Sequence, residues 1–349
     1  MYKSKKILAL LLSALLLLGV MSGCADKQTS PSTPPESSSA PESSSPPESS
    51  SAPESSSPPE SSSAEPGVAM KTVTDDLGRE VTIPVKPERI LALNSARIEE
   101  LFSLGVTPVA KVDEYKIREE GMNLPSVGQS KNINIEAIYE VKPDLILAHS
   151  RNHGDIVKAL EETGFPVYYF DPAKNQQLSD NDVLMFLAEL IGKEKEAQQY
   201  IDELNAFSAE YAKKIAEQTD IKTGVIINDG DTVKAAQKAS GFGAVLEALG
   251  IENIVPDDLP GAATASFVNF DVETILEKNP DIVLIMAGSN DKEQNKALLQ
   301  KYVNDPKWAG MDAVKNGRVM ILPFKVNPNR SSRQDMIRIT AETILSSVK

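Results

Sequence analysis

Residues 134–148 read NIEAIYEVKPDLILA, and residues 271–285 read DVETILEKNPDIVLI. With an offset of 137 residues the two segments share six identical positions: Glu136/Glu273, Ile138/Ile275, Glu140/Glu277, Pro143/Pro280, Asp144/Asp281 and Leu147/Leu284. In each segment a helical pattern stops at a proline and an apolar strand follows. A solenoid would repeat every 20–50 residues or so, and this repeat is much longer, so it predicts two similar domains.

Short strands alternate with helices on both sides of the repeat. In the first half we predict a hairpin of strands 72–74 and 81–83, strands 89–93, 108–112, 144–148 and 167–170, and helices 98–104, 134–142 and 156–163. In the second half we predict strands 224–228, 281–287 and 318–322 and helices 242–249, 271–279 and 333–347. Such alternation predicts α/β domains with parallel sheets.

Residues 178–218 interrupt the alternation with helical patterns only, and Gly192 divides them into a shorter and a longer helix. The longer one carries a single apolar stripe, made by Ala197, Tyr200, Ile201, Leu204, Phe207, Tyr211 and Ile215. A helix of this length spans on the order of 35 Å, about the diameter of a domain. We therefore expect an N-terminal α/β lobe at 70–177, an inter-lobe helix region at 178–220 and a C-terminal α/β lobe at 221–349.

The N-terminus has the pattern of an export signal. Lysines 3, 5 and 6 precede about 14 apolar residues, too few for a membrane span of about 20. Residues 1–23 are thus predicted to be a signal peptide. The sequence Met21-Ser22-Gly23-Cys24 resembles a bacterial lipobox, in which Cys24 would be lipidated, although an ordinary signal peptide with an incidental cysteine is the alternative.

Residues 24–69 contain five copies of a PESSSA or PESSSP unit between Pro35 and Ala64. This composition cannot form a core, so we expect a disordered tether. Cys24 is the only cysteine, which excludes an intrachain disulfide. The net charge is −14, and removal of three lysines with the signal peptide gives −14 − 3 = −17, which argues against a nucleic-acid partner.

Several segments together resemble the solute-binding lipoproteins of class III ABC importers, which serve ferric siderophores, haem and cobalamin. They are TVTDDLGREVTIP (72–84), RILAL (89–93), ELFSLGV (100–106), SVGQSKNINIEAIYEVKPDLILA (126–148) and FVNFDVETILEKNPDIVLI (267–285). The resemblance covers roughly residues 70–347. It implies two Rossmann-like parallel-sheet lobes, one long rigid helix joining them, and a ligand cleft between the lobes.

The same resemblance implies the binding partners and the cellular location of the protein. Glu136 and Glu273 would dock onto arginines of the membrane permease, which works with an ATPase. The alternative is a purely structural role, in which each glutamate only complements the dipole of its helix. The protein would be a monomer, lipid-anchored on the extracytoplasmic face of the cell membrane, at a Gram-positive-type cell surface.

Ligand-binding residues are expected in loops at the strand ends, where open α/β sheets bind. The candidate loops are 94–97, 115–118, 149–153, 229–234, 261–267 and 325–333. The candidates are Arg97, Tyr115, Arg118, His149, Arg151, Arg330 and Arg333. Guanidinium groups suit carboxylates and catecholates, which favours an anionic ferric chelate over near-neutral cobalamin, although some of these arginines are expected to form ordinary salt bridges. His149 and His153 are the only histidines and fall in a predicted loop, so no metal site is expected, while haem ligation by His149, Tyr115 or Met286 stays open.

The sequence thus predicts a binding protein that captures a ferric siderophore, with no resident cofactor. A haem or cobalamin receptor of the same family is the first alternative. An exported α/β enzyme or a wall adhesin is the second, and it is disfavoured because the chain lacks the GxSxG, HExxH, P-loop and Rossmann glycine motifs.

Overall fold

Both copies of the repeated segment fold as a helix followed by a buried strand. The helices are α3 (Ile135–Val141) and α10 (Val272–Lys278), and the strands are β6 (Leu145–His149) and β12 (Ile282–Met286). Asn134 and Asp271 cap the helix starts through their side chains. The helices end at Lys142 and Asn279, both left-handed, with φ of 44° and 43°. The two copies of the repeat therefore share the same local structure, including the left-handed residue at the end of each helix.

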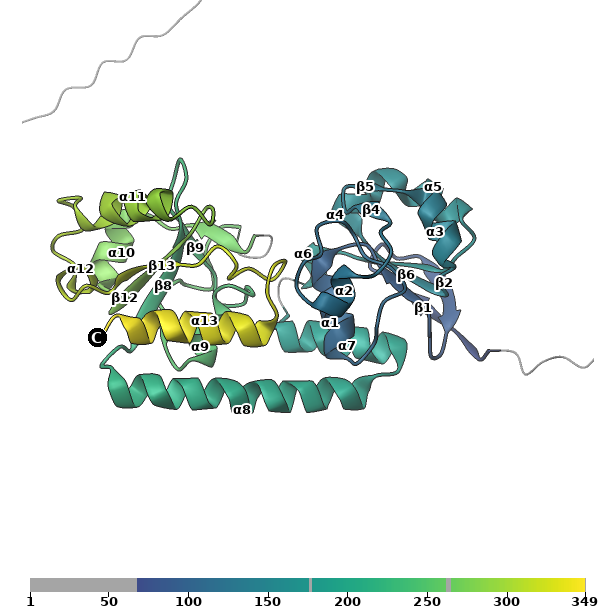
Figure 1. Cartoon of the computed structure of the whole chain (residues 1–349), viewed down its shortest axis with the longest axis horizontal. Helices are drawn as coiled ribbons and strands as arrows, with labels where there is room; N and C mark the ends of the chain where they lie inside the picture. Colours follow the sequence, from purple (N-terminus) through teal and green to yellow (C-terminus); the bar gives the residue numbers. More distant parts are fainter. Residues whose placement is uncertain (1–67, 176–177, 262–264, 349) are drawn as a thin grey trace, which may run out of the picture. The chain divides into compact units, whose positions relative to one another are not determined.

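The computed structural model describes residues 68–175, 178–261 and 265–348, which belong to one unit, Ser63–Lys349 (Figure 1). The predicted signal peptide, Cys24 and the tether up to residue 67 lie outside the described residues. Within the described part of the chain, no helix is both long and apolar enough to cross a membrane.

The N-terminal lobe is built on a three-stranded parallel sheet. Its order is β3 (Ile90–Ala92), β6 and β7 (Val167–Phe170), and the predicted hairpin forms beside it as β1 (Met70–Thr74) and β2 (Glu80–Pro84). A small hairpin joins β4 (Gly128–Gln129) to β5 (Asn132–Ile133). The helices are α1 (Ser95–Ser103), α2 (Glu119–Met122), α4 (Ser150–His153), α5 (Val157–Glu162), α6 (Pro172–Asn175) and the 3₁₀ turn η1 (Gly154–Ile156).

The predicted strand at 108–112 does not form. Val109 donates to Ile90 and Lys111 makes an isolated bridge with Ser126, so this segment runs beside the sheet without joining it. Pro108 has no backbone N–H to give to a ladder, which limits regular pairing here.

The C-terminal lobe has a mixed sheet of order β11-β9-β8-β12-β13, with β10 paired to β8. The strands are β8 (Thr223–Asn228), β9 (Lys234–Ala236), β10 (Glu252–Asn253), β11 (Phe267–Asn269), β12 and β13 (Val319–Leu322). β8, β10, β12 and β13 run parallel to one another, as predicted for the strands at 224–228, 281–287 and 318–322, whereas β9 runs antiparallel to both of its neighbours, β8 and β11. The connection from β8 to β9 is too short for the crossover that a parallel pair needs, so it forms a hairpin.

Helices cover this sheet: α9 (Ala244–Ala248), α10, α11 (Lys292–Val303), α12 (Asp312–Lys315) and α13 (Arg333–Ser346). The sequence did not predict α11.

The predicted long helix is present and joins the two lobes. α7 (Asp180–Ile191) ends at Gly192, whose φ of 73° allows the turn into α8 (Glu194–Gln218). In Figure 1, α8 runs beneath both lobes. Its Ala197 and Ile201 belong to the core of the N-terminal lobe, whereas Leu204 and Ile215 belong to a core of the C-terminal lobe. One continuous helix thus contributes to both cores.

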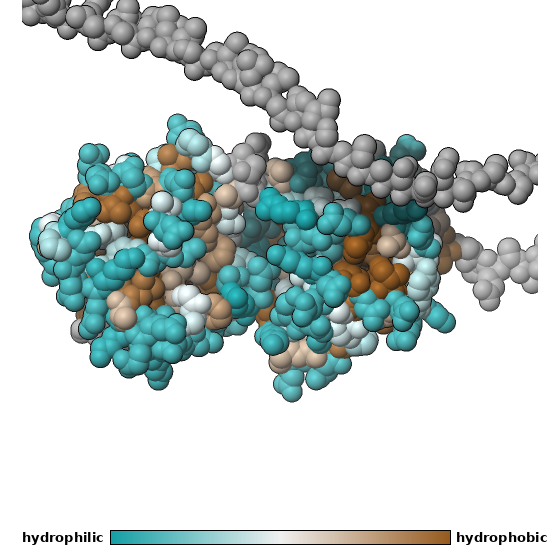
Figure 2. All heavy atoms as spheres, turned by 90° about the horizontal axis from the view of Figure 1, so that it is seen from above, coloured by the Kyte–Doolittle hydropathy of each residue, from teal (hydrophilic) through white to brown (hydrophobic). Residues whose placement is uncertain are grey.

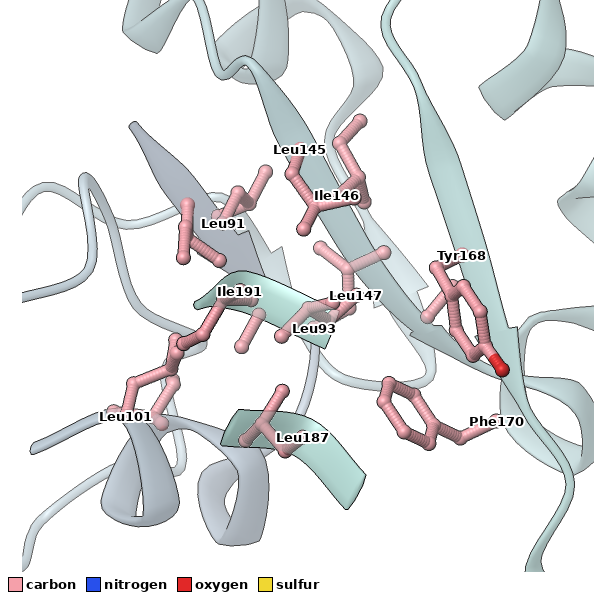
Figure 3. Packing of buried hydrophobic residues seen from close by; sticks show 14 of the residues in the cluster. Leu91, Leu93, Leu101, Leu145, Ile146, Leu147, Tyr168, Phe170, Leu187 and Ile191 are labelled. Carbon is pink, nitrogen blue, oxygen red and sulfur yellow. The ribbon is translucent and has the colours of Figure 1, made fainter. Parts of the chain in front are cut away.

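The N-terminal core shows why the short strands are stable (Figure 3). Leu91, Leu145 and Leu147 from the sheet have no exposed surface and belong to one hydrophobic core with Leu187 and Ile191 of α7. Strands buried on both faces read as continuous apolar runs, which is how β6 could be predicted from the sequence. Because the strands are buried in this core, the loops that follow them are the segments where we expect a ligand to bind.

Candidate functional site

Two neighbouring pockets lie between the lobes. We call them the wide pocket, about 660 Å³, and the narrow pocket, about 280 Å³. Asn94 lines both of them. Figure 2 shows a largely hydrophilic face with a hollow between the two lobes. Pockets of roughly 300–1,000 Å³ are the size that binds small molecules.

Several residues that line the wide pocket come shortly after the carboxyl ends of parallel strands, in both lobes. From the N-terminal lobe come Asn94, Ser95, Glu114, Lys116, Ser130 and Asn152, and from the C-terminal lobe Asn290, Phe324, Lys325, Asn327, Asn329 and Arg330. Asn94 follows β3, Asn290 follows β12 and Phe324 follows β13. This is where the strand-end rule for open α/β sheets places a ligand.

Three exposed cations dominate the charge of the wide pocket. Lys116, Lys325 and Arg330 form no salt bridge with any residue that the structure describes. Glu114 is the one carboxylate in the lining, and it accepts from the backbone N–H of Ser130 at 3.0 Å. The pocket therefore carries excess positive charge and many amide groups, a combination suited to an anionic, hydrogen-bonding ligand.

The narrow pocket contains Arg97 in a fixed position. Asn94 caps α1 by accepting from the backbone N–H of Arg97 at 2.9 Å, and the Arg97 side chain lies over the end of β7. The guanidinium lies 4.0 Å from the ring centroid of Phe170 and forms an ion pair with Glu100. Asp180, the first residue of α7, also lines this pocket.

His149 lines the narrow pocket at the end of β6, whereas His153 is structural. The buried His153 ring accepts from the backbone N–H of His149 at 2.8 Å, and its other nitrogen lies 2.8 Å from the carbonyl of Ser130. These bonds close one turn of helix, α4, where we predicted a loop. Nδ1 of His149 is buried and finds no partner among the described residues.

Burial, together with the neighbouring positive charges of Arg97 and Arg151 and the ring of His153, lowers the pKa of His149 to about 4. His149 is therefore neutral at pH 7 and offers a ring nitrogen rather than a charge. Within the described residues no group of three or more His, Cys, Asp or Glu side chains could hold a metal ion.

Tyr115 and Arg118 do not reach either pocket. Tyr115 has no exposed surface, and its hydroxyl donates to Glu99 at 2.9 Å. Arg118 makes a bidentate pair with the same carboxylate, from Nη2 to Oε1 at 2.7 Å and from Nε to Oε2 at 3.1 Å. Their side chains are thus committed to Glu99 within the N-terminal lobe, and the expectation that they face the ligand is not supported by their location.

The remaining two arginines differ in position. Arg333 begins α13 beneath the narrow pocket and donates through Nη2 to Asn181 at 2.7 Å, while its Nη1 is buried without a partner in the described chain. Arg333 and Asp180 line the same two small cavities there, so Arg333 lies at the junction of the lobes. Arg151 is exposed on α4 and lies outside the pockets.

Glu136 and Glu273 lie in the first turns of α3 and α10, as the sequence predicted. Both are exposed, lie outside the two pockets, and form no side-chain hydrogen bond or ion pair with the described residues. Their carboxylates are thus available to a partner.

Sequence reasoning missed most of the polar lining. It named the loops that hold Lys116 and Lys325 but chose arginines within them, and it did not select the asparagines at 94, 152, 290, 327 and 329. A usable signal was present, since Asn94 and Asn290 closely follow predicted strands. No wall residue comes from the proposed loop 229–234, because Asp229 accepts hydrogen bonds from Lys301 and Tyr302 instead.

The chain is similar to several known proteins. The chain is 27% identical to the putative ABC transporter substrate-binding lipoprotein YhfQ of Bacillus subtilis over 263 residues, which is 71% of this chain and 79% of that protein. It is 26% identical over 259 residues to the Fe(3+)-citrate-binding protein YfmC of the same organism, covering 71% and 77%.

The structure of Staphylococcus aureus SirA complexed with staphyloferrin B aligns with a TM-score of 0.62 at 20% identity, covering 80% of this chain and 99% of that one. This likeness shows the two-lobed fold. Residues 90–326 match the family model described as periplasmic binding protein. That match spans most of both lobes and the helix between them, and the chain therefore belongs to the periplasmic binding protein family.

Proposed function

We propose that this chain is the substrate-binding lipoprotein of an ABC importer and that it captures a ferric siderophore. The relatives support the transporter role, because one is named as an ABC transporter substrate-binding lipoprotein and another as an Fe(3+)-citrate-binding protein. The role is binding and delivery rather than catalysis, and the iron chelate is cargo rather than a resident cofactor.

The lining of the wide pocket carries the ligand choice. Lys116, Lys325 and Arg330 supply unpaired positive charge, and five asparagines supply amide donors and acceptors. Ferric siderophores are hydrophilic chelates that present oxygen atoms at their surface, often with negative charge. Charge-assisted hydrogen bonds to such oxygens are about twice as strong as neutral ones, so this lining favours an anionic chelate.

The same lining disfavours haem. Phe324 is the one aromatic residue in the wall of the wide pocket, and the guanidinium of Arg330 covers its face at 4.0 Å. The apolar faces of a porphyrin need apolar walls, because unpaired polar groups are costly when buried. Two of the residues considered for haem ligation, Tyr115 and Met286, are buried in the lobes.

Delivery requires contact with a permease, and we assign this contact to Glu136 and Glu273. Both carboxylates are exposed and unpaired on equivalent helices of the two lobes. Lipidation at Cys24 would hold a monomeric protein on the extracytoplasmic face of the membrane, at a Gram-positive-type surface, with the tether between anchor and lobes.

The test is isothermal titration calorimetry of the purified protein with ferric citrate, ferric enterobactin, ferrioxamine B, haem and cyanocobalamin. Calorimetry is preferable to tryptophan quenching because Trp308, the single tryptophan, is 2% exposed and packs against Tyr302 in the C-terminal lobe. We expect submicromolar binding of a ferric siderophore. Tight binding of haem or cobalamin with no response to any ferric siderophore would overturn the proposal.

A matched pair of variants checks the site. Arg330→Gln removes a cation from the wide pocket. It should weaken the binding of the chelate by at least about tenfold, because this is the typical cost of losing a charged hydrogen bond. Lys296→Gln removes an exposed cation of α11 outside the pockets and should leave the affinity unchanged.

A further inference from the structure

Each lobe presents an arginine stacked on a phenylalanine inside the cleft. Arg97 lies 4.0 Å from the ring centroid of Phe170 in the narrow pocket, and Arg330 lies 4.0 Å from that of Phe324 in the wide pocket. Stacking fixes the plane of a guanidinium and leaves the N–H groups on its edge to bind an acceptor. The two arginines are therefore built alike.

Arg97 and Arg330 differ in the partner that binds the N–H groups on the edge of the guanidinium. Arg97 forms an ion pair with Glu100, one turn further along α1, whereas Arg330 has no carboxylate partner among the described residues. The narrow pocket contains the charges of Arg97, Glu100 and Asp180 and thus no excess positive charge. Excess positive charge in the cleft is confined to the wide pocket.

Glu100 is surrounded by charged groups from its own helix and from two other helices. Arg97 faces it from its own helix, Asp180 from α7 and Arg333 from α13, and Tyr200 of α8 lines the adjoining small cavity. Its side chain is 26% exposed. Burial raises the pKa of Glu100, and Arg97 opposes that rise. The Arg97 guanidinium can therefore become available to a ligand in two ways: its ion pair with Glu100 separates, or the Glu100 carboxylate is protonated.

We propose that Glu100 competes inside the cleft with the anionic groups of the ligand for Arg97. In the empty cleft Glu100 neutralises Arg97, so an anionic chelate binds first at Lys116, Lys325 and Arg330. It engages Arg97 only by displacing Glu100. Glu100 thus sets how strongly the cleft prefers anionic chelates, an inference that rests on the proposed function and narrows its ligand to ferric chelates bearing negative oxygen groups.

The direct test is Glu100→Gln, which keeps the size of the side chain and removes its charge. Anionic ferric citrate and ferric enterobactin should bind at least about tenfold more tightly to this variant than to the wild type. A unit charge about 4 Å away is worth about fivefold in bulk water and several hundredfold at an effective dielectric constant of about 20, and the cleft lies between these limits. Positively charged ferrioxamine B should gain nothing. Glu189→Gln, an exposed carboxylate of α7 outside the pockets, is the matched control and should change no affinity.

A double-mutant cycle separates this role from a structural one. In the wild type, Arg97→Gln should weaken anionic chelates less than Arg330→Gln does, because Arg97 is already neutralised. In the Glu100→Gln background the Arg97 substitution should become as costly as that of Arg330. A residue that only supported the fold would give the same Arg97 effect in both backgrounds.

Wild-type protein supplies a measurement that needs no stable variant. As the pH falls through the raised pKa of Glu100, its negative charge is lost and affinity for an anionic chelate should approach that of Glu100→Gln. Titration of the chelate itself affects both proteins equally, so it cancels in the ratio of the wild-type dissociation constant to that of Glu100→Gln. This ratio should fall toward one at acid pH.

Two failures are distinguishable. Anionic chelates that bind equally well to wild type and Glu100→Gln overturn this inference and leave the proposed function intact. If no ferric chelate binds to either protein, the proposed function falls and this inference falls with it.

Discussion

Asp144 and Asp281 make the same connection in the two lobes. Asp144 accepts from the backbone N–H groups of Glu88 and Arg89 at 2.8 and 2.9 Å, directly before β3. Asp281 accepts from those of Lys222 and Thr223 at 2.7 and 2.9 Å, at the start of β8. Each aspartate therefore ties the start of its own strand to the start of the neighbouring parallel strand. The repeated Pro-Asp pair marks a register contact, which explains its presence in both halves.

Substituting either aspartate by alanine should destabilise the protein. Each change leaves two backbone N–H groups without their charged acceptor, and we expect the free energy of unfolding to fall by about 1–3 kcal/mol. Urea denaturation with circular dichroism measures it. Asp155→Ala, at an exposed aspartate of η1, is the control and should stay within about 0.5 kcal/mol. Equal stabilities for all three variants would show that the paired bonds do not fix the strands.

The elements that the sequence predicted well carry their signals locally. Asn134 caps a helix, Gly192 breaks one, and uninterrupted apolar runs mark β6 and β12. Other elements depend on distant partners. α11 buries only Tyr302 and has no apolar stripe, so no periodicity reveals it. β9 and β11 are short antiparallel strands whose existence depends on pairing at the edge of a sheet.

The site was predictable to the level of loops but not of side chains. The strand-end rule selected segments 94–97 and 149–153, both of which contribute residues to the pocket linings, because the topology dictates where those strand ends meet. It could not show that Glu99, 19 residues before Arg118, forms an ion pair with the Arg118 guanidinium. Nor could it show that Lys116 faces the cleft while its neighbour Tyr115 is buried. Which cations remain unpaired is decided by tertiary contacts that residue types do not reveal.

The paired glutamates lead to a prediction about transport. Glu136→Ala combined with Glu273→Ala should abolish uptake of the chelate in cells while leaving its dissociation constant unchanged, because both carboxylates are exposed and outside the pockets. Uptake of radiolabelled iron and calorimetry measure the two quantities.

The repeat supplies a matched control for that experiment. Glu140 and Glu277 are also identical between the halves, are also exposed and lie one turn further along the same helices. Glu140→Ala with Glu277→Ala should transport normally if docking requires the first-turn carboxylates. Normal uptake by the Glu136/Glu273 double variant would end the docking assignment, and a weakened chelate affinity would place these residues at the ligand instead.

His149 should make the protein less stable in acid. Its pKa is about 4 in the folded protein and roughly 6.5 in the unfolded chain, so between these values the unfolded chain binds the extra proton. The free energy of unfolding must therefore fall as the pH is lowered from about 6.5 to 4. Burial also lowers the pKa of His153, which acts in the same direction and persists in any His149 variant. Urea unfolding of wild type and His149→Gln across this range should show a shallower acid loss in the variant. Parallel pH curves for the two proteins would mean that the ring of His149 accepts a proton in the folded state as readily as in water, which its buried, unpartnered Nδ1 argues against.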